Sequence, residues 1–124
     1  MHVNKLEDLI VWQEAKKLLI DVYSLTKKFP ADEKYNLVKH IKECARNIPG
    51  NIAEGFGRFH YQDSARFYRI ARGSLNELKS DIYCSLDLSY IDKADFENIS
   101  KQVEYVGKLL NGTVRSLNKF NTNH

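Results

Sequence analysis

Apolar residues recur every three or four positions along most of this chain. In the segment from about 9 to 28, one apolar row runs from Val11 to Leu25, and a second row beginning at Trp12 lies beside it. This spacing is that of an amphipathic helix. Because a small bundle needs about one apolar stripe per helix, the second row predicts that the chain buries apolar surface against further copies of itself.

Three further segments show the same helical spacing, and no segment alternates apolar and polar residues as a strand does. Four helices with short connections imply antiparallel neighbours. The sequence therefore predicts one all-α domain over residues 1–124, an antiparallel up-and-down four-helix bundle. The predicted helices cover about 9–28, 33–57, 63–89 and 93–117, and the polar stretch 118–124 is predicted to be a frayed tail.

Local signals set the predicted helix ends. A Phe-Pro step at 29–30 stops the first helix, because the residue before proline avoids helical angles. Aspartates then offer carboxylate caps to the following helices. Asp32 is predicted to cap the second helix, Asp63 the third, and Asp92 with Asp95 to form a capping box on the fourth.

Two glycine-containing blocks predict a helical hairpin. Gly55 and Gly57 flank Phe56 where the second apolar pattern stops, and we expect them to supply the positive φ angles that end this helix. Gly73 and Ser74 interrupt the third pattern, where glycine costs ~1 kcal/mol relative to alanine. We expect this second block to let a neighbouring backbone come close.

Pro49 allows two interpretations. Ile48-Pro49-Gly50-Asn51 fits a type II turn, and proline inside a helix costs ~3 kcal/mol. The apolar phase nevertheless continues from Ile48 to Ile52 without a slip. The prediction is a second helix that runs through Pro49 with a kink.

Positive charge is concentrated in the middle of the chain, although the net charge is only +3. In the predicted hairpin, Arg46 comes level with Arg72 and Lys39 with Lys79, so that two basic rows form one strip. Such a strip suits the phosphate backbone of RNA or DNA. The predicted nucleic-acid-binding residues are Lys39, Lys42, Arg46, Arg58, Arg66, Arg69, Arg72 and Lys79.

Two other interpretations of these charges stay open. They can be ordinary solvated side chains, some of them paired with neighbouring glutamates. Alternatively, the protein is an interaction scaffold, for example an accessory subunit of a reverse transcriptase, and its charges serve solubility.

A second polar group is predicted to be structural. Asn51 and Glu54 lie on one face of the second helix, and Ser74 and Glu77 lie on the facing helix, so that with arginines they can form a partly buried network. No nucleophile or second titrating group accompanies them. We therefore expect a protein without enzymatic activity.

The sequence gives little support for a metal site, a redox site or a membrane span. None of the four histidines follows a glutamate by three residues, as a di-iron bundle requires. Cys44 and Cys84 lack the short spacing of a zinc or redox motif and are interpreted as reduced core residues. Neither metal nor cofactor is expected. No apolar run approaches the ~20 residues of a membrane span, and the start of the chain lacks a secretion signal, so a cytoplasmic protein without membrane contact is predicted.

Several blocks of this chain occur in a recognisable combination: Trp12 with Ala15, Phe29-Pro30, Glu33-Tyr35-Leu37, Ile48-Pro49, Asn51-Ile52-Ala53-Glu54-Gly55, Gly57-Arg58, and Ala71-Arg72-Gly73-Ser74-Leu75 with Glu77. Together they resemble the four-helix-bundle family encoded by intervening sequences of large-subunit (23S) ribosomal RNA genes, a family similar to the accessory variability protein of diversity-generating retroelements. The resemblance implies an up-down-up-down bundle, assembly as a homopentamer, a basic surface for nucleic acid and no enzymatic activity. Where the family often has glutamine, isoleucine and two arginines, this chain has His40, Ile41, Lys42 and Glu43, and Arg46 replaces a small or apolar residue.

Overall fold

The computed structural model describes residues 3–122, with side chains described from 3 to 118, and its long elements are all helices. Short 3-10 turns, η1 and η2, precede the first two of them. The elements are η1 (Leu6–Asp8), α1 (Ile10–Thr26), η2 (Ala31–Glu33), α2 (Leu37–Phe56), α3 (Tyr61–Asp87) and α4 (Lys93–Thr122).

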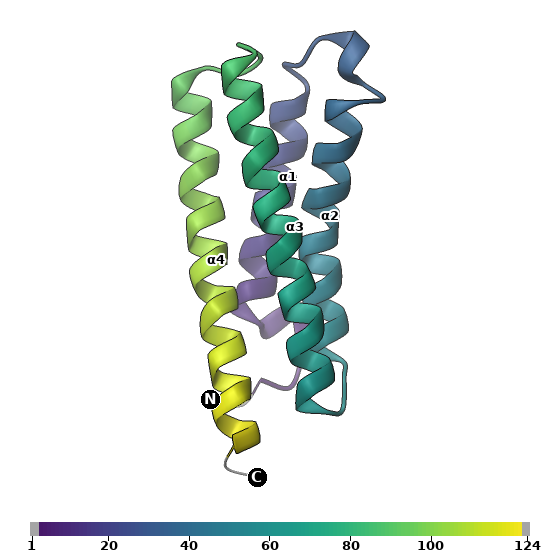
Figure 1. The fold of residues 1–124 in the computed structure, drawn as a ribbon, viewed down its shortest axis with the longest axis vertical. Helices are drawn as coiled ribbons and strands as arrows, with labels where there is room; N and C mark the ends of the chain where they lie inside the picture. The colour runs from purple at the N-terminus through teal and green to yellow at the C-terminus, as the bar shows by residue number, and fades with distance from the viewer. Residues whose placement is uncertain (1–2, 123–124) are drawn as a thin grey trace.

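The four helices run up, down, up and down, as Figure 1 shows, and both ends of the chain lie at the same end of the bundle. Each helix packs against two neighbours: α2 and α4 each contact both α1 and α3. The helices therefore form a square in which the α1–α2 side lies opposite the α3–α4 side. This arrangement confirms the predicted fold class.

The core is built from the predicted apolar rows. Leu18, Ile41, Leu78 and Leu110, one from each helix, are all 0% exposed. Burial of each such side chain stabilises the fold by roughly 1.5–3 kcal/mol before conformational entropy is counted. Along the described residues, no helix is both long enough and apolar enough to cross a bilayer.

The second apolar row of α1 is partly accommodated within the bundle. Trp12 and Leu19 are half-buried and pack against the same core. The large apolar side chains that α1 leaves outside are Ile10, 52% exposed, and Ile20, 64% exposed. The surface available for self-association is thus smaller than the sequence suggested.

Helix α2 continues without a break from Leu37 to Phe56 and contains Pro49. The type II turn considered for this segment is therefore wrong. Ile48, Pro49 and Ile52 are all buried, so the continuous apolar face keeps the segment helical in spite of the proline. The kink stays a prediction.

The caps of α2 and α3 differ from those predicted. Asp32 lies in η2, and α2 begins only at Leu37, whose backbone N–H donates to the Glu33 carboxylate at 3.5 Å. Tyr90 Oη donates to the other oxygen of Glu33 at 2.7 Å, and this contact holds the loop in place. Asp63 falls inside the first turn of α3 rather than before it, where a carboxylate still favours the helix dipole.

The fourth helix begins with the capping box that the sequence predicted. Asp95 N donates to Asp92 Oδ1 at 2.8 Å, and Asp92 N donates to Asp95 Oδ2 at 3.3 Å. The helix then runs to Thr122 rather than ending at 117, so the predicted frayed tail is wrong for 118–122. Residues 123 and 124 lie outside the described part.

The glycines at the end of α2 and within α3 do not have the roles that the sequence predicted. No described glycine has a positive φ, and Gly57 ends α2 with a φ of −80°. A Cβ on Gly55 would lie 3.0 Å from both Ser64 O and Tyr68 Cε1, whereas one on Gly73 would meet nothing within 4 Å. The close approach of α2 and α3 therefore occurs at Gly55 and not at Gly73.

Candidate functional site

The predicted basic residues do not form one strip. Arg72 Nη1 donates to Asn111 Oδ1 at 3.0 Å, and Lys79 Nζ pairs with Glu104 Oε1 at 3.1 Å, so both reach across to α4. Lys42 Nζ instead lies over the Tyr23 ring of α1, 5.0 Å from its centroid. Because the α1–α2 and α3–α4 sides are opposite, a single strip over α2 and α3 is wrong.

The remaining predicted basic residues are scattered. Arg58 and Arg66 meet at the hairpin, where their Cζ atoms lie 4.5 and 5.3 Å from the Phe67 ring centroid. Lys39 and Arg46 are exposed on α2, and within residues 3–118 they form no ion pair. Helical spacing placed residues on faces correctly, but it did not show which neighbour each face meets.

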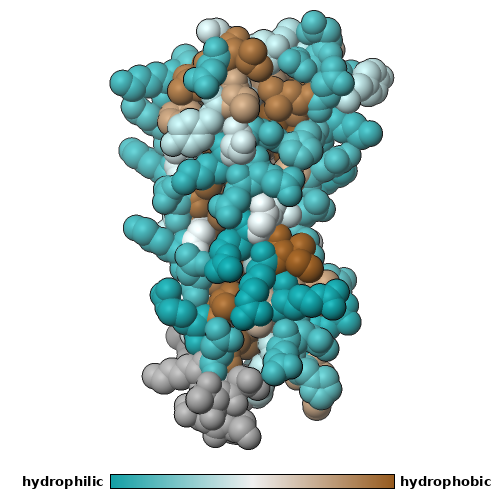
Figure 2. Space-filling model, in the orientation of Figure 1, coloured by the Kyte–Doolittle hydropathy of each residue, from teal (hydrophilic) through white to brown (hydrophobic). Residues whose placement is uncertain are grey.

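A basic groove follows the α3–α4 side. One hollow of about 350 Å³ is lined by Arg72, Lys79 and Lys108, with Glu104 as its acidic member. A second hollow, also about 350 Å³, continues the same side toward the hairpin end and contains Arg69. Figure 2 shows that hydrophilic residues dominate this face of the molecule. We call these hollows the α3–α4 groove; Lys108 was absent from the predicted set because it lies on α4, far from the other basic residues in sequence.

The predicted polar network of Asn51, Glu54, Ser74 and Glu77 does not form. Asn51 Nδ2 donates to the backbone carbonyl of Asn47 at 2.8 Å, one turn earlier in its own helix. Glu54 is exposed and pairs with Arg58 at 2.9 Å. Glu77 instead contacts His40 and Cys44. Among the described contacts, Ser74 bonds to none of the other three residues of the predicted network. Asn51 and Glu54 thus find their partners one turn away within their own helix or at its end.

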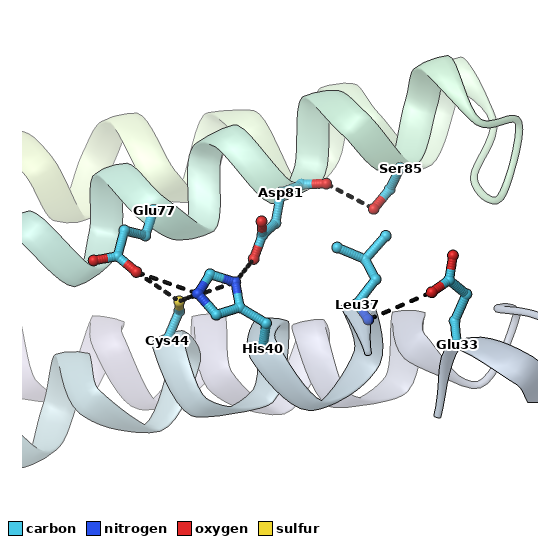
Figure 3. Close-up of polar contacts among 7 residues, drawn as sticks. All are labelled: Glu33, Leu37, His40, Cys44, Glu77, Asp81 and Ser85. Carbon is cyan, nitrogen blue, oxygen red and sulfur yellow. Dashed lines mark hydrogen bonds and ion pairs between the residues drawn. The ribbon is translucent and has the colours of Figure 1, made fainter. Parts of the chain in front are cut away.

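A different polar cluster joins α2 to α3. Figure 3 shows His40 and Cys44 of α2 directed toward Glu77 and Asp81 of α3. Each pair is four residues apart, so its two members stand one turn apart on the same helical face. The antiparallel packing of α2 on α3 brings these two faces together. We call these four residues the α2–α3 cluster.

The imidazole of His40 is at the centre of the α2–α3 cluster. Its Nδ1 contacts Asp81 Oδ2, and its Nε2 lies 3.3 Å from Glu77 Oε2. Cys44 Sγ lies 3.7 Å from His40 Nε2 and 3.7 Å from Glu77 Oε2, to which the thiol donates. The three atoms Sγ, Nε2 and Oε2 therefore form a nearly regular triangle.

The two carboxylates shift the proton affinities of their neighbours. The hydrogen bond from His40 to Asp81, with the negative charges of Asp81 and Glu77, raises the pKa of His40 above its ordinary value. Burial, followed by the same two charges, raises the pKa of Cys44 to about 12. The cluster is thus a site of negative potential around a thiol and an imidazole.

The two cysteines have different environments. Cys44 is buried, as predicted, but Cys84 is exposed on α3, so its assignment to the core is wrong. Both are free thiols. The sequence signal for the α2–α3 cluster was present as two pairs, His-x-x-x-Cys at 40–44 and Glu-x-x-x-Asp at 77–81. Neither the Glu-x-x-His spacing of a di-iron bundle nor the short cysteine spacing of a zinc or redox motif describes such pairs.

The fold and these surfaces define an all-α, up-and-down four-helix bundle with a basic groove on one side. The family described as 23S rRNA-intervening sequence protein matches residues 7–112, and the chain belongs to this family. A similar solved structure is the crystal structure of a protein of unknown function from the S23 ribosomal protein family of Bacteroides thetaiotaomicron. The two share 20% sequence identity with a TM-score of 0.79, over 86% of this chain and 96% of that chain, which shows the common fold. No curated protein matches this chain.

Proposed function

We propose that this protein is a non-enzymatic nucleic-acid-binding protein that contacts phosphates along the α3–α4 groove. The observation that carries the proposal is the grouping of four basic residues on one side of the bundle, where Glu104 is the acidic residue that lines the same hollow. The four are Arg69, Arg72, Lys79 and Lys108.

The chemistry of the α3–α4 groove fits a sugar-phosphate backbone. Arginine and lysine side chains neutralise phosphates, and asparagine amides commonly bond to phosphate and sugar oxygens. Asn76 and Asn111 line the same hollow as Arg72. Arg72 is already held by the Asn111 carboxamide oxygen, so its guanidinium is partly positioned for a ligand. Contacts of this kind carry affinity without base specificity.

Two variants of equal charge change test the proposal. Arg69→Glu/Arg72→Glu alters the α3–α4 groove, and Lys39→Glu/Arg46→Glu alters the outer face of α2. We expect the first variant to lose roughly 100-fold in affinity for a structured RNA, with a salt slope lower by about 2. The second should stay within about threefold of the parent protein. Fluorescence anisotropy over a range of salt concentrations measures both.

Two results would overturn the proposal. One is no binding of RNA or duplex DNA by the parent protein at low salt, which would favour the protein-interaction scaffold. The other is an equal loss in both variants, since this would show attraction by net charge without a defined interface. Circular dichroism of both variants establishes that the bundle is intact.

We also propose that the protein forms a homo-oligomer, in line with the pentamer that the family resemblance implies. Support comes from a hollow of about 370 Å³ between α1 and α4 that is lined in part by Ile20, Tyr105 and Val106. Ile20 is 64% exposed and Tyr105 48% exposed. Light scattering should give a mass several times 14.4 kDa. Ile20→Glu should lower this mass, whereas Tyr35→Ser, which changes an exposed residue outside the hollow, should not. A monomer mass for the parent protein at micromolar concentration would contradict this assembly.

A further inference from the structure

We propose that the α2–α3 cluster binds one Zn²⁺ ion through Cys44 Sγ, His40 Nε2 and Glu77 Oε2, with Asp81 orienting the imidazole. The three donor atoms come from two helices and already face one another (Figure 3). This site lies across α3 from the α3–α4 groove, so it does not depend on nucleic-acid binding.

The spacing of the donors matches a tetrahedral ion. Zinc binds sulfur at about 2.3 Å and nitrogen or oxygen at about 2.0–2.2 Å, so tetrahedral donors stand roughly 3.3–3.6 Å apart. In the α2–α3 cluster the sides of the donor triangle measure 3.3, 3.7 and 3.7 Å. These spacings differ from the tetrahedral values by no more than a few tenths of an ångström.

Asp81 gives the site the supporting residue that zinc-bound histidines generally have. Its carboxylate contacts His40 Nδ1 and accepts a hydrogen bond from the proton there, so that Nε2, once it has released its own proton, offers its lone pair to the metal. Asp81 is itself well enclosed, with 15% of its side chain exposed. An alternative arrangement is available as well, because His40, Cys44 and Asp81 each offer a ligand atom within 4.8 Å of the others.

Burial and charge favour a soft divalent cation. Cys44 is 3% exposed, whereas the side chains of His40 and Glu77 are 47% and 62% exposed, so the site has a protected sulfur and an open entry. On binding, the Cys44 thiol and the protonated Nε2 of His40 each release a proton to solvent, and the thiolate sulfur and the Nε2 lone pair then coordinate the metal. A thiolate and an imidazole select zinc over magnesium or calcium, which prefer oxygen ligands.

Cobalt and zinc titrations of the untagged, metal-stripped protein test the site. We expect one Zn²⁺ per chain by calorimetry and a higher melting temperature with zinc. Co²⁺ should produce the visible bands of a tetrahedral ion and a near-ultraviolet thiolate charge-transfer band. Asp81→Asn should weaken zinc binding by roughly 10- to 100-fold, as loss of a histidine-orienting carboxylate does.

Matched variants distinguish this site from adventitious binding. Cys44→Ser should abolish the charge-transfer band, and Cys84→Ser, which changes the exposed cysteine, should retain it. Glu77→Gln changes an exposed side chain and tests the third ligand without disturbing the core. The proposal fails if the folded parent protein shows no charge-transfer band, or if Cys44→Ser and Cys84→Ser bind Co²⁺ identically.

Discussion

Helix α3 presents opposite charges to its two neighbours. Toward α2 it directs Glu77 and Asp81, which meet a histidine and a thiol, and toward α4 it directs Arg72 and Lys79. With about 100° of rotation per residue, positions 77 and 79 lie roughly 200° apart around the helix. Charges mixed along the sequence are therefore separated in space, and the two sides of one helix can bind ligands of opposite sign.

The sharpest test of this comparison measures the affinities for RNA and for zinc on variants of each side of α3. Arg69→Glu/Arg72→Glu should lower RNA affinity roughly 100-fold and leave zinc affinity unchanged within about twofold. Glu77→Gln should do the reverse, because it removes a zinc ligand and leaves the α3–α4 groove intact. Anisotropy and calorimetry on the same preparations measure both. A variant that loses both ligands would show that the two sides are coupled.

The two sides also differ in how closely α3 approaches its neighbour. We expect Gly55→Ala to destabilise the protein by about 1–3 kcal/mol, because its Cβ would lie 3.0 Å from a backbone oxygen of α3 that cannot move freely. Gly107→Ala on α4 should instead stabilise it by about 0.5–1 kcal/mol. Its Cβ meets only the flexible Leu75 side chain, at 3.5 Å.

Urea denaturation of these two glycine variants measures both effects. Equal changes of the same sign would mean that α3 packs on α2 no more tightly than on α4.

An alkaline titration tests the tight packing of Tyr68 on the α2-facing side. Burial raises the pKa of Tyr68 to about 12 from an ordinary value of 10.0, so the folded state favours its neutral form. Stability from this group is complete below pH 10 and is lost as the pH rises toward 12, by about 1 kcal/mol at pH 11. Tyr68→Phe should remove this loss.

Tyr83→Phe, which changes an exposed tyrosine of α3, is the control for the alkaline titration. Denaturation at pH 8 and pH 11 compares both variants with the parent protein. If the two variants lose stability equally between these pH values, Tyr68 is not the group responsible.

The smallest effect is expected from the ion pair across α3 and α4. Lys79 and Glu104 have side chains 46% and 61% exposed, so water and salt screen their attraction. A double-mutant cycle with Lys79→Ala and Glu104→Ala should give a coupling energy below about 1 kcal/mol. A larger coupling energy would indicate that Glu104 holds Lys79 firmly, which would leave the Lys79 ammonium less available to bind a phosphate.

Particular residues show how far prediction from the sequence reached. The capping box at Asp92 and Asp95 was predicted because its hydrogen bonds lie within one turn and need no other part of the chain. The cap at Asp32 was wrong, because Tyr90, distant in sequence, bonds to Glu33 and helps to hold the preceding loop in a 3-10 turn. Gly55 was expected to end the second helix and Gly73 to admit a neighbouring backbone, but the close approach lies at Gly55, which only the packed neighbour shows.

The sequence by itself determined the all-α class, the order of the helices, the rows that form the core and the buried position of Cys44, because these follow from a helical period and from local contacts. Tertiary structure alone decided which face of each helix meets which neighbour. It thereby divided the basic residues between opposite sides and brought His40 and Cys44 against Glu77 and Asp81. The physical reason is that helical spacing fixes only the direction of a side chain around its own axis, whereas its partners depend on how the helices pack.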